Sequence, residues 1–175
     1  RLHDHINQIK ALNKSIGQYD KMIKTSFDQH EKAALFNQLP GAAAQLAPRL
    51  LAAFCLINPD EANEMQTRVG IAPIRVQSGK STKTFMRQQC PKFLRQTFHE
   101  FARCSVNSSG WAKAFYEHQT KVKRCSPHAA KRALAYKWIR ILVANWKSNT
   151  PYNEMEYIAA LQKRKSPLAE LILCN

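Results

Sequence analysis

Apolar residues recur at every seventh position through the first 27 residues of the chain. The repeat runs through Leu2, Ile9, Ile16 and Ile23, with Leu12 and Tyr19 between them. Such a repeat is typical of a helix whose apolar stripe faces a second helix in a coiled coil. We therefore expect residues 1–27 to be a coiled-coil helix through which the protein self-associates as a dimer or higher oligomer. The alternative is an amphipathic helix that lies on its own domain.

The positive charge of the chain is concentrated in its middle. Residues 65–150 hold 17 basic residues but only two acidic ones, Glu100 and Glu117, and the segments on either side are neutral. All of the net charge of +15 therefore lies in this block. Mutual repulsion of this size destabilises a compact domain unless a polyanion binds it. The charge pattern favours a nucleic-acid partner over a membrane, and no apolar run approaches the roughly 18 residues of a membrane span.

The sequence around the first Pro-Gly pair predicts two short helices. A helix is expected from residue 28 to residue 39, Pro40 and Gly41 end it, and a nearly apolar helix follows from residue 42 to residue 55. This is the outline of a helix-hairpin-helix, a motif whose turn amides can hold a DNA phosphate.

One long stretch departs from helical periodicity. It runs from Gly70 to Thr84, reads GIAPIRVQSGKSTKT, and favours a short β-hairpin or an extended loop. Helical patterns return from Arg87 onward. The fold is therefore expected to be mainly α, with one irregular or β-hairpin functional loop. The expected organisation is a coiled-coil helix at 1–27, a helical domain at 28–163 and a C-terminal tail at 164–175.

Short motifs occur along the chain in an order that is familiar. They are Leu39-Pro40-Gly41, Gly70-Ile71-Ala72-Pro73, Ser78-Gly79, Cys90-Pro91, Leu94-Arg95, Ala133-Leu134-Ala135, Lys137-Trp138-Ile139-Arg140, Trp146 and Pro151-Tyr152. Together they resemble the C-terminal half of the "one-ten" insertion-sequence transposases, relatives of the Piv-type DNA invertases. The resemblance covers roughly residues 1–163. Because the chain begins with Arg1 and is patterned from the start, we expect it to be a fragment of a longer protein.

The resemblance implies that different domains of the complete protein carry different parts of its activity. In that family a RuvC-like domain with an acidic tetrad precedes the coiled coil, and a structured guide RNA directs target choice. It implies that Mg²⁺ binds in the N-terminal domain absent from this chain, that no cofactor binds to the fragment itself, and that the fragment is inactive alone. It also implies a bacterial or archaeal protein of the cytoplasm and nucleoid. Where the family commonly has Pro-Gly-x-Gly, Ala43 replaces the second glycine.

The family serine that becomes linked to DNA corresponds to Ser78, five residues after Pro73. Gly79 permits a close approach of the DNA backbone. Four cations within ten residues can neutralise charge on a phosphate, namely Arg75, Lys80, Lys83 and Arg87. Because no Asp or Glu lies between Glu64 and Glu100, a carboxylate base or a carboxylate-bound metal has to come from another domain. Taken without the resemblance, Ser78 is an ordinary loop serine and Ser81 competes with it as the nucleophile.

The segment SGKST after Gln77 is similar to part of a phosphate-binding P-loop. The first glycine of that motif is missing, because position 74 holds Ile, so we reject ATP binding. Further contacts to a nucleic-acid backbone are expected from Arg95, Arg103, Lys121, Lys123 and Arg124. Two alternatives remain: a helix-hairpin-helix module that binds DNA or RNA without chemistry, and a coiled-coil oligomerisation segment whose charge serves solubility.

Overall fold

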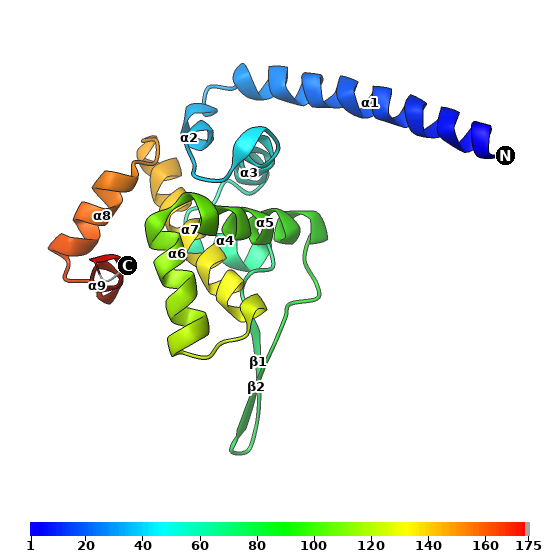
Figure 1. The fold of residues 1–175 in the computed structure, drawn as a ribbon. Coiled ribbons are helices and arrows are strands. Elements are labelled where there is room, and N and C mark those ends of the chain that lie inside the picture. The colour runs from blue at the N-terminus through cyan, green and yellow to red at the C-terminus, as the bar shows by residue number, and fades with distance from the viewer. Residues whose placement is uncertain (174–175) are drawn as a thin grey trace.

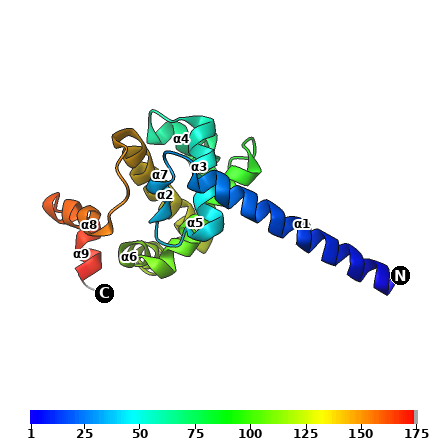
Figure 2. The same ribbon diagram turned by 90° about the horizontal axis from the view of Figure 1, so that it is seen from above.

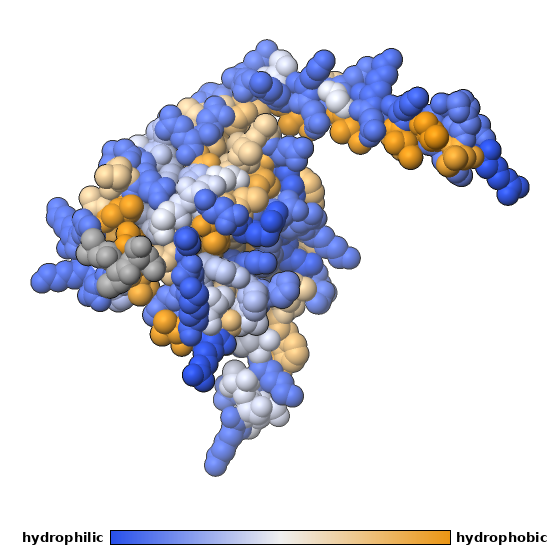
Figure 3. Space-filling model, in the orientation of Figure 1, coloured by the Kyte–Doolittle hydropathy of each residue, from blue (hydrophilic) through white to orange (hydrophobic). Residues whose placement is uncertain are grey.

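The first helix projects from the rest of the molecule. In the computed structural model, which describes residues 1–173, α1 (Leu2–Asp28) extends away from a body of shorter helices (Figures 1 and 2). Residues 1–26 are all exposed, and Phe27 is the first side chain to enter the core. The apolar stripe runs along one side of the projecting helix (Figure 3). The expected long helix is confirmed, and its stripe does not pack on the chain's own domain.

The body is built almost entirely from helices, as expected. The structure forms α2 (Ala34–Asn37), α3 (Ala43–Ile57), α4 (Ala62–Arg68), α5 (Lys92–Ser108), α6 (Gly110–Glu117), the π-helix η1 (His118–Val122), α7 (Pro127–Ser148), α8 (Glu154–Lys163) and α9 (Pro167–Leu173). The domain boundaries expected from the sequence stay predictions. The last two residues of the expected C-terminal tail, 174 and 175, lie outside the described part of the chain.

The helix expected from residue 28 to residue 39 is shorter than its sequence pattern indicates. After Asp28, the last residue of α1, only α2 is helical in this range, and residues 29–33 form turns. The His30 ring nitrogen Nδ1 accepts a hydrogen bond from the backbone amide of Lys32 at 3.1 Å. Buried Phe27 and Ala33 hold both ends of this turn in the core. A local side-chain to backbone hydrogen bond therefore competes with the helical pattern.

Helix α7 lies at the centre of the core. Its Trp138 ring contacts Trp111 at 4.7 Å between centroids, and both indoles are fully buried. Their ring N–H groups are satisfied, because Trp111 Nε1 donates to Tyr152 Oη at 2.8 Å and Trp138 Nε1 donates to Ser105 Oγ at 2.7 Å. A buried indole needs such a partner. These tryptophans therefore belong to the core and present no face to a nucleic-acid base.

The turn between α2 and α3 packs against α5. Gly41 has a φ of +80°, and a Cβ at this residue would lie 2.7 Å from the carbonyl carbon of Cys104 and 2.9 Å from the amide nitrogen of Ser105. Ala43 also adopts a positive φ, +47°, a conformation that costs alanine more than glycine. The glycine that the family commonly has at this position would fit the observed backbone. One side of the turn is thus occupied by α5.

The expected hairpin is present between α4 and α5. Strands β1 (Ile74–Ser78) and β2 (Ser81–Phe85) pair antiparallel, from Ile74 opposite Phe85 to Ser78 opposite Ser81. Gly79 has a φ of +56° at the first position of the two-residue turn, where hairpins favour glycine. The hairpin projects from the helical body (Figure 1). Among the helices of residues 1–173, none combines the length and apolar character that a membrane crossing requires.

Candidate active site on the hairpin

Ser78 is the last residue of β1 and lies beside the hairpin turn. Its side chain is exposed, and no group among residues 1–173 forms a hydrogen bond with its hydroxyl. Ser81 lies directly opposite in the ladder, so the hairpin brings the two candidate nucleophiles together. An exposed, unpartnered hydroxyl is free to approach a phosphorus atom, which a nucleophile requires.

The strand register divides the cations around Ser78 between two faces. Side chains alternate along a strand, so Ser78 shares its face with Val76 and with the cross-strand residues Ser81 and Lys83. Arg75 pairs with Thr84 on the opposite face. Lys83 is therefore the strand cation on the serine's face, and Lys80 lies in the turn itself.

Two arginines, Arg87 and Arg95, lie at the base of the hairpin. The guanidinium of Arg95, on α5, donates to the backbone oxygen of Arg87 at 2.7 Å and to the Cys90 sulfur at 3.6 Å. The Nε of Arg87 is buried and has no partner in the described part of the chain. Arg95, expected from the sequence as a backbone contact, thus holds the segment by which the hairpin joins α5. The sequence around Arg95, which follows a Leu in α5, did not predict this hydrogen bond to Arg87.

The face that carries Ser78 is apolar toward the base of the hairpin. Ile74, Val76, Phe85 and Met86 are exposed there, and they border a pocket of about 530 Å³. Clustered apolar side chains in water are costly and typically mark a contact surface. Sequence reasoning missed this surface, although the alternation of Ile74 and Val76 in β1 indicated one apolar face.

Carboxylates are absent from the hairpin. No Asp or Glu lies between Glu64 and Glu100. Among residues 1–173, no group of three or more His, Cys, Asp or Glu side chains is placed to hold a metal ion. The described residues therefore do not fit a Mg²⁺ site next to Ser78.

A second basic surface lies between α5 and α7. Its residues border a pocket of about 540 Å³, lined by His99, Glu100, Arg103, His128, Lys131, Arg132, Gln96 and Met86. Burial lowers the pKa of His99, and the neighbouring cations Arg132 and Arg95 lower it further. Because Met86 lines this pocket as well as the hairpin pocket, the two surfaces are continuous.

The charge of Glu100 in this second surface is already paired. Its carboxylate accepts a hydrogen bond from Arg49 at 2.7 Å and another from Gln96 at 2.7 Å. Arg103 is exposed beside it, and its expected contact with a nucleic-acid backbone stays a prediction. The sequence did not indicate that His99, His128 and Lys131 would line this surface.

The remaining expected contacts lie around the π-helix. Lys121 forms an ion pair with Glu117 at 2.8 Å, so part of its charge is neutralised. Lys123 and Arg124 are exposed and have no carboxylate partner in the described part of the chain. Arg124 has a positive φ of +52° and turns the chain toward α7. Of the three, Lys123 and Arg124 are the better placed for a phosphate.

Comparison with known proteins identifies the segment that carries the hairpin. Residues 33–117 match the family described as Transposase IS116/IS110/IS902 family. No curated protein matches the chain significantly. The matched segment runs from the turn before α2 to the end of α6 and includes Ser78. The match supports the interpretation of this chain as a fragment of a one-ten family insertion-sequence transposase, as its motifs indicated, and a transposase acts on DNA.

Proposed function

We propose that this chain is the serine-bearing part of an RNA-guided DNA transposase that cuts and rejoins DNA through a phosphoserine at Ser78. The observation that carries the proposal is the exposed, unpartnered hydroxyl at the tip of a projecting hairpin within the transposase segment. Lys83 on the same face and Lys80 in the turn supply positive charge where the phosphate would lie.

The reaction at Ser78 is a phosphoryl transfer. The Oγ–phosphorus bond forms, the bond from phosphorus to the leaving deoxyribose oxygen breaks, the serine proton passes to a base, and the leaving oxygen takes up a proton. Lysines at the phosphate oxygens stabilise the charge that spreads over them in the transition state. Because the phosphoserine ester keeps the energy of the broken bond, attack by another deoxyribose hydroxyl rejoins the strand without ATP.

The base for this reaction comes from outside the hairpin. We propose that the acidic RuvC-like domain of the complete protein supplies it and also binds Mg²⁺. That domain would cover the apolar face of Ile74, Val76, Phe85 and Met86, next to the serine. An acidic partner complements the basic hairpin in charge. The isolated chain is then inactive, since its serine has no proton acceptor.

The other partners follow from the remaining surfaces. We propose that the unpaired apolar stripe of α1 joins copies of the chain, and that guide RNA and DNA share the basic surfaces around His99, Arg103 and Arg124. The protein would work on DNA in the cytoplasm of a bacterium or archaeon, at the nucleoid.

The competing function is a helix-hairpin-helix module that binds nucleic acid without chemistry. In that case the turn at Pro40 and Gly41 would face a phosphate. The close approach of Gly41 to the α5 backbone gives this turn a packing role instead. A non-catalytic module would also have no need of an exposed serine on a projecting hairpin.

The experiment that separates these functions traps a protein–DNA adduct. The complete protein, with its RuvC-like domain and guide RNA, is incubated with labelled DNA, denatured and mapped by mass spectrometry. We expect the adduct on Ser78 and its loss in Ser78→Ala, with nucleic-acid binding retained. Thr82→Ala, on the opposite face of the same hairpin, is the matched control and should keep the adduct. Binding without any adduct in the wild-type protein would favour the non-catalytic module.

A further inference from the structure

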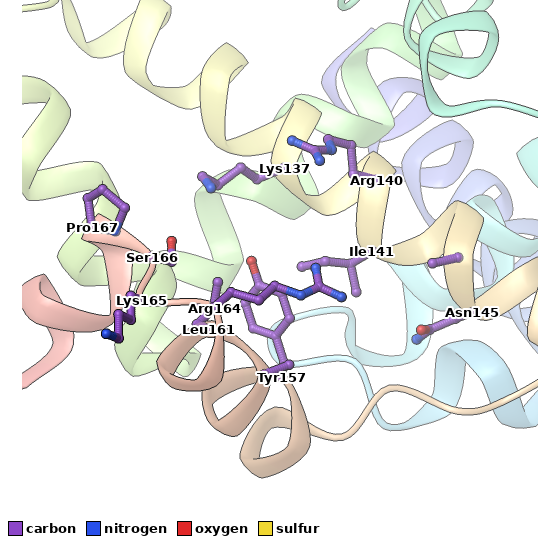
Figure 4. A pocket seen from close by; sticks show the side chains of 12 residues that line it. Lys137, Arg140, Ile141, Asn145, Tyr157, Leu161, Arg164, Lys165, Ser166 and Pro167 are labelled. Carbon is purple, nitrogen blue, oxygen red and sulfur yellow. The ribbon is translucent and has the colours of Figure 1, made fainter.

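A cationic cleft lies on the body outside the transposase segment. It is formed where α7 faces α8 and the turn into α9, and its volume is about 610 Å³. We call it the α7–α8 cleft, and its polar side chains are Lys137, Arg140, Asn145, Tyr157, Arg164, Lys165 and Ser166 (Figure 4). None of these residues belongs to the matched segment 33–117 or to the hairpin. This volume lies within the general range of small-ligand pockets, about 300–1,000 Å³.

No carboxylate among residues 1–173 neutralises the cations of the α7–α8 cleft. No Asp or Glu lines the cleft, and Lys137, Arg140, Arg164 and Lys165 take part in none of the ion pairs among residues 1–173. The acidic residues near the start of α8 are engaged elsewhere, because Glu154 accepts from Ser109 and Glu156 from Asn153. Four like charges around one cavity repel one another, and an anion in the cavity would relieve that repulsion.

Lys137 is the most constrained of these cations. It is half-buried, and its Nζ lies 5.0 Å from the centre of the Phe115 ring. Burial lowers its pKa, and Arg140 and Lys123 lower it further through their charges. The charge of Lys123, in the turn after η1, thus acts on Lys137 at one side of the cleft.

Tyr157 provides a hydroxyl within this positive cavity. Its ring contacts Trp111 at 5.0 Å between centroids, so the side chain is held from behind by the core. Burial raises the pKa of Tyr157, and its hydroxyl therefore stays protonated and can donate a hydrogen bond. In Figure 4 the hydroxyl points into the space between Lys137 and Arg164. A hydroxyl donor among cations is the arrangement that binds a phosphate oxygen.

We propose that the α7–α8 cleft is a second, non-catalytic site that binds the phosphodiester backbone of a nucleic-acid strand, RNA or DNA. The strand would pass from the basic turn at Lys123 and Arg124 into the cleft, with phosphates near Arg140 and Arg164. The inference rests on the proposed function for its nucleic-acid partner, and it involves no chemistry at Ser78. It assigns a binding role to α8, which lies beyond the matched segment.

The test compares backbone affinity in matched charge variants of the 175-residue chain. Arg140→Gln/Arg164→Gln removes two exposed cations from the cleft, and Lys10→Gln/Lys14→Gln removes two from the projecting α1. Binding to single-stranded RNA and DNA of about 15 nucleotides is measured by fluorescence anisotropy at several salt concentrations. We expect the cleft variant to bind on the order of tenfold more weakly, with a log–log salt slope smaller by about 1.4 for two lost phosphate contacts on a single strand.

The loss of affinity in the cleft variants shows which nucleic acid binds the cleft. The experiment also separates the cleft proposal from the proposed mechanism at Ser78. A loss with RNA alone assigns the cleft to the guide, a loss with DNA alone assigns it to the substrate, and equal losses assign it to either backbone. Tyr157→Phe, which keeps the ring packing, should weaken binding by about threefold, the energy of one hydrogen bond. Affinity and slope unchanged in both cleft variants would overturn the inference. The adduct at Ser78 is measured separately, so its absence would refute the proposed function while leaving this result intact.

Discussion

Replacing Gly41 by alanine tests whether the turn between α2 and α3 is a packing element. The new Cβ would lie 2.7 to 2.9 Å from backbone atoms of Cys104 and Ser105, and a backbone segment cannot move aside as a side-chain end can. A left-handed φ costs alanine about 1–2 kcal/mol, and overpacking adds about 1–3 kcal/mol. The stiffer unfolded chain offsets about 0.4–1 kcal/mol of this. We expect a net loss of about 2–4 kcal/mol.

This loss is large enough to measure by thermal unfolding followed by circular dichroism. For a chain of this size, about 2–4 °C of Tm corresponds to each kcal/mol, so Gly41→Ala should lower Tm by about 5–15 °C. Gly110→Ala is the matched control. A Cβ added at Gly110 would have no atom within 4 Å, and the φ of this residue is not positive. The control should unfold at the wild-type temperature or slightly above. A Gly41→Ala variant with wild-type Tm would refute the packing against α5 and leave the turn free for a phosphate.

Three further predictions concern separate parts of the molecule. Ile9→Asp/Ile16→Asp should abolish self-association in sedimentation experiments without unfolding the body, because both side chains are exposed on α1; a wild-type chain that is monomeric at high concentration would contradict the coiled coil. Lys123→Ala/Arg124→Ala should reduce the log–log salt slope of duplex DNA binding by about 1.8, and an unchanged slope would remove both residues from the interface. The pKa of His99 is lowered below its ordinary 6.5, so the unfolded chain binds the proton more readily and stability should fall as pH drops below about 6.5. His99→Gln should flatten this fall in urea titrations between about pH 7 and pH 5, and an equally steep fall would show that another group causes it.

The sequence was sufficient to predict the elements that depend on local patterns. The heptads of residues 1–27 indicated α1, and the break in periodicity after Gly70 indicated the hairpin. The register of that hairpin follows from its two-residue turn, where Gly79 takes the positive φ. The position of Ser78 at the end of a strand could therefore be predicted from the sequence. Its role as a nucleophile was inferred from the family resemblance.

Contacts between segments that lie far apart in the chain could not be predicted from the sequence. The shortening of the second helix depends on His30 and on the burial of Phe27 and Ala33, which only the packed core reveals. Arg95 was indistinguishable from a surface arginine until its contact with the Arg87 carbonyl placed it at the base of the hairpin. The α7–α8 cleft likewise joins residues from three helices, so no single segment of the sequence shows its concentration of charge.

The most direct test of the serine mechanism is the identity of the atom that carries DNA after cleavage. The reaction of the complete protein and the proposed guide RNA with a labelled target is stopped by denaturation. The product is digested with protease and nuclease and analysed by tandem mass spectrometry. We expect a nucleotide-phosphate adduct on Ser78, absent in Ser78→Ala and retained in Ser81→Ala, because the two serines face each other across one turn but only Ser78 matches the family position. An adduct on Ser81, or full recombination by Ser78→Ala, would contradict the proposed mechanism.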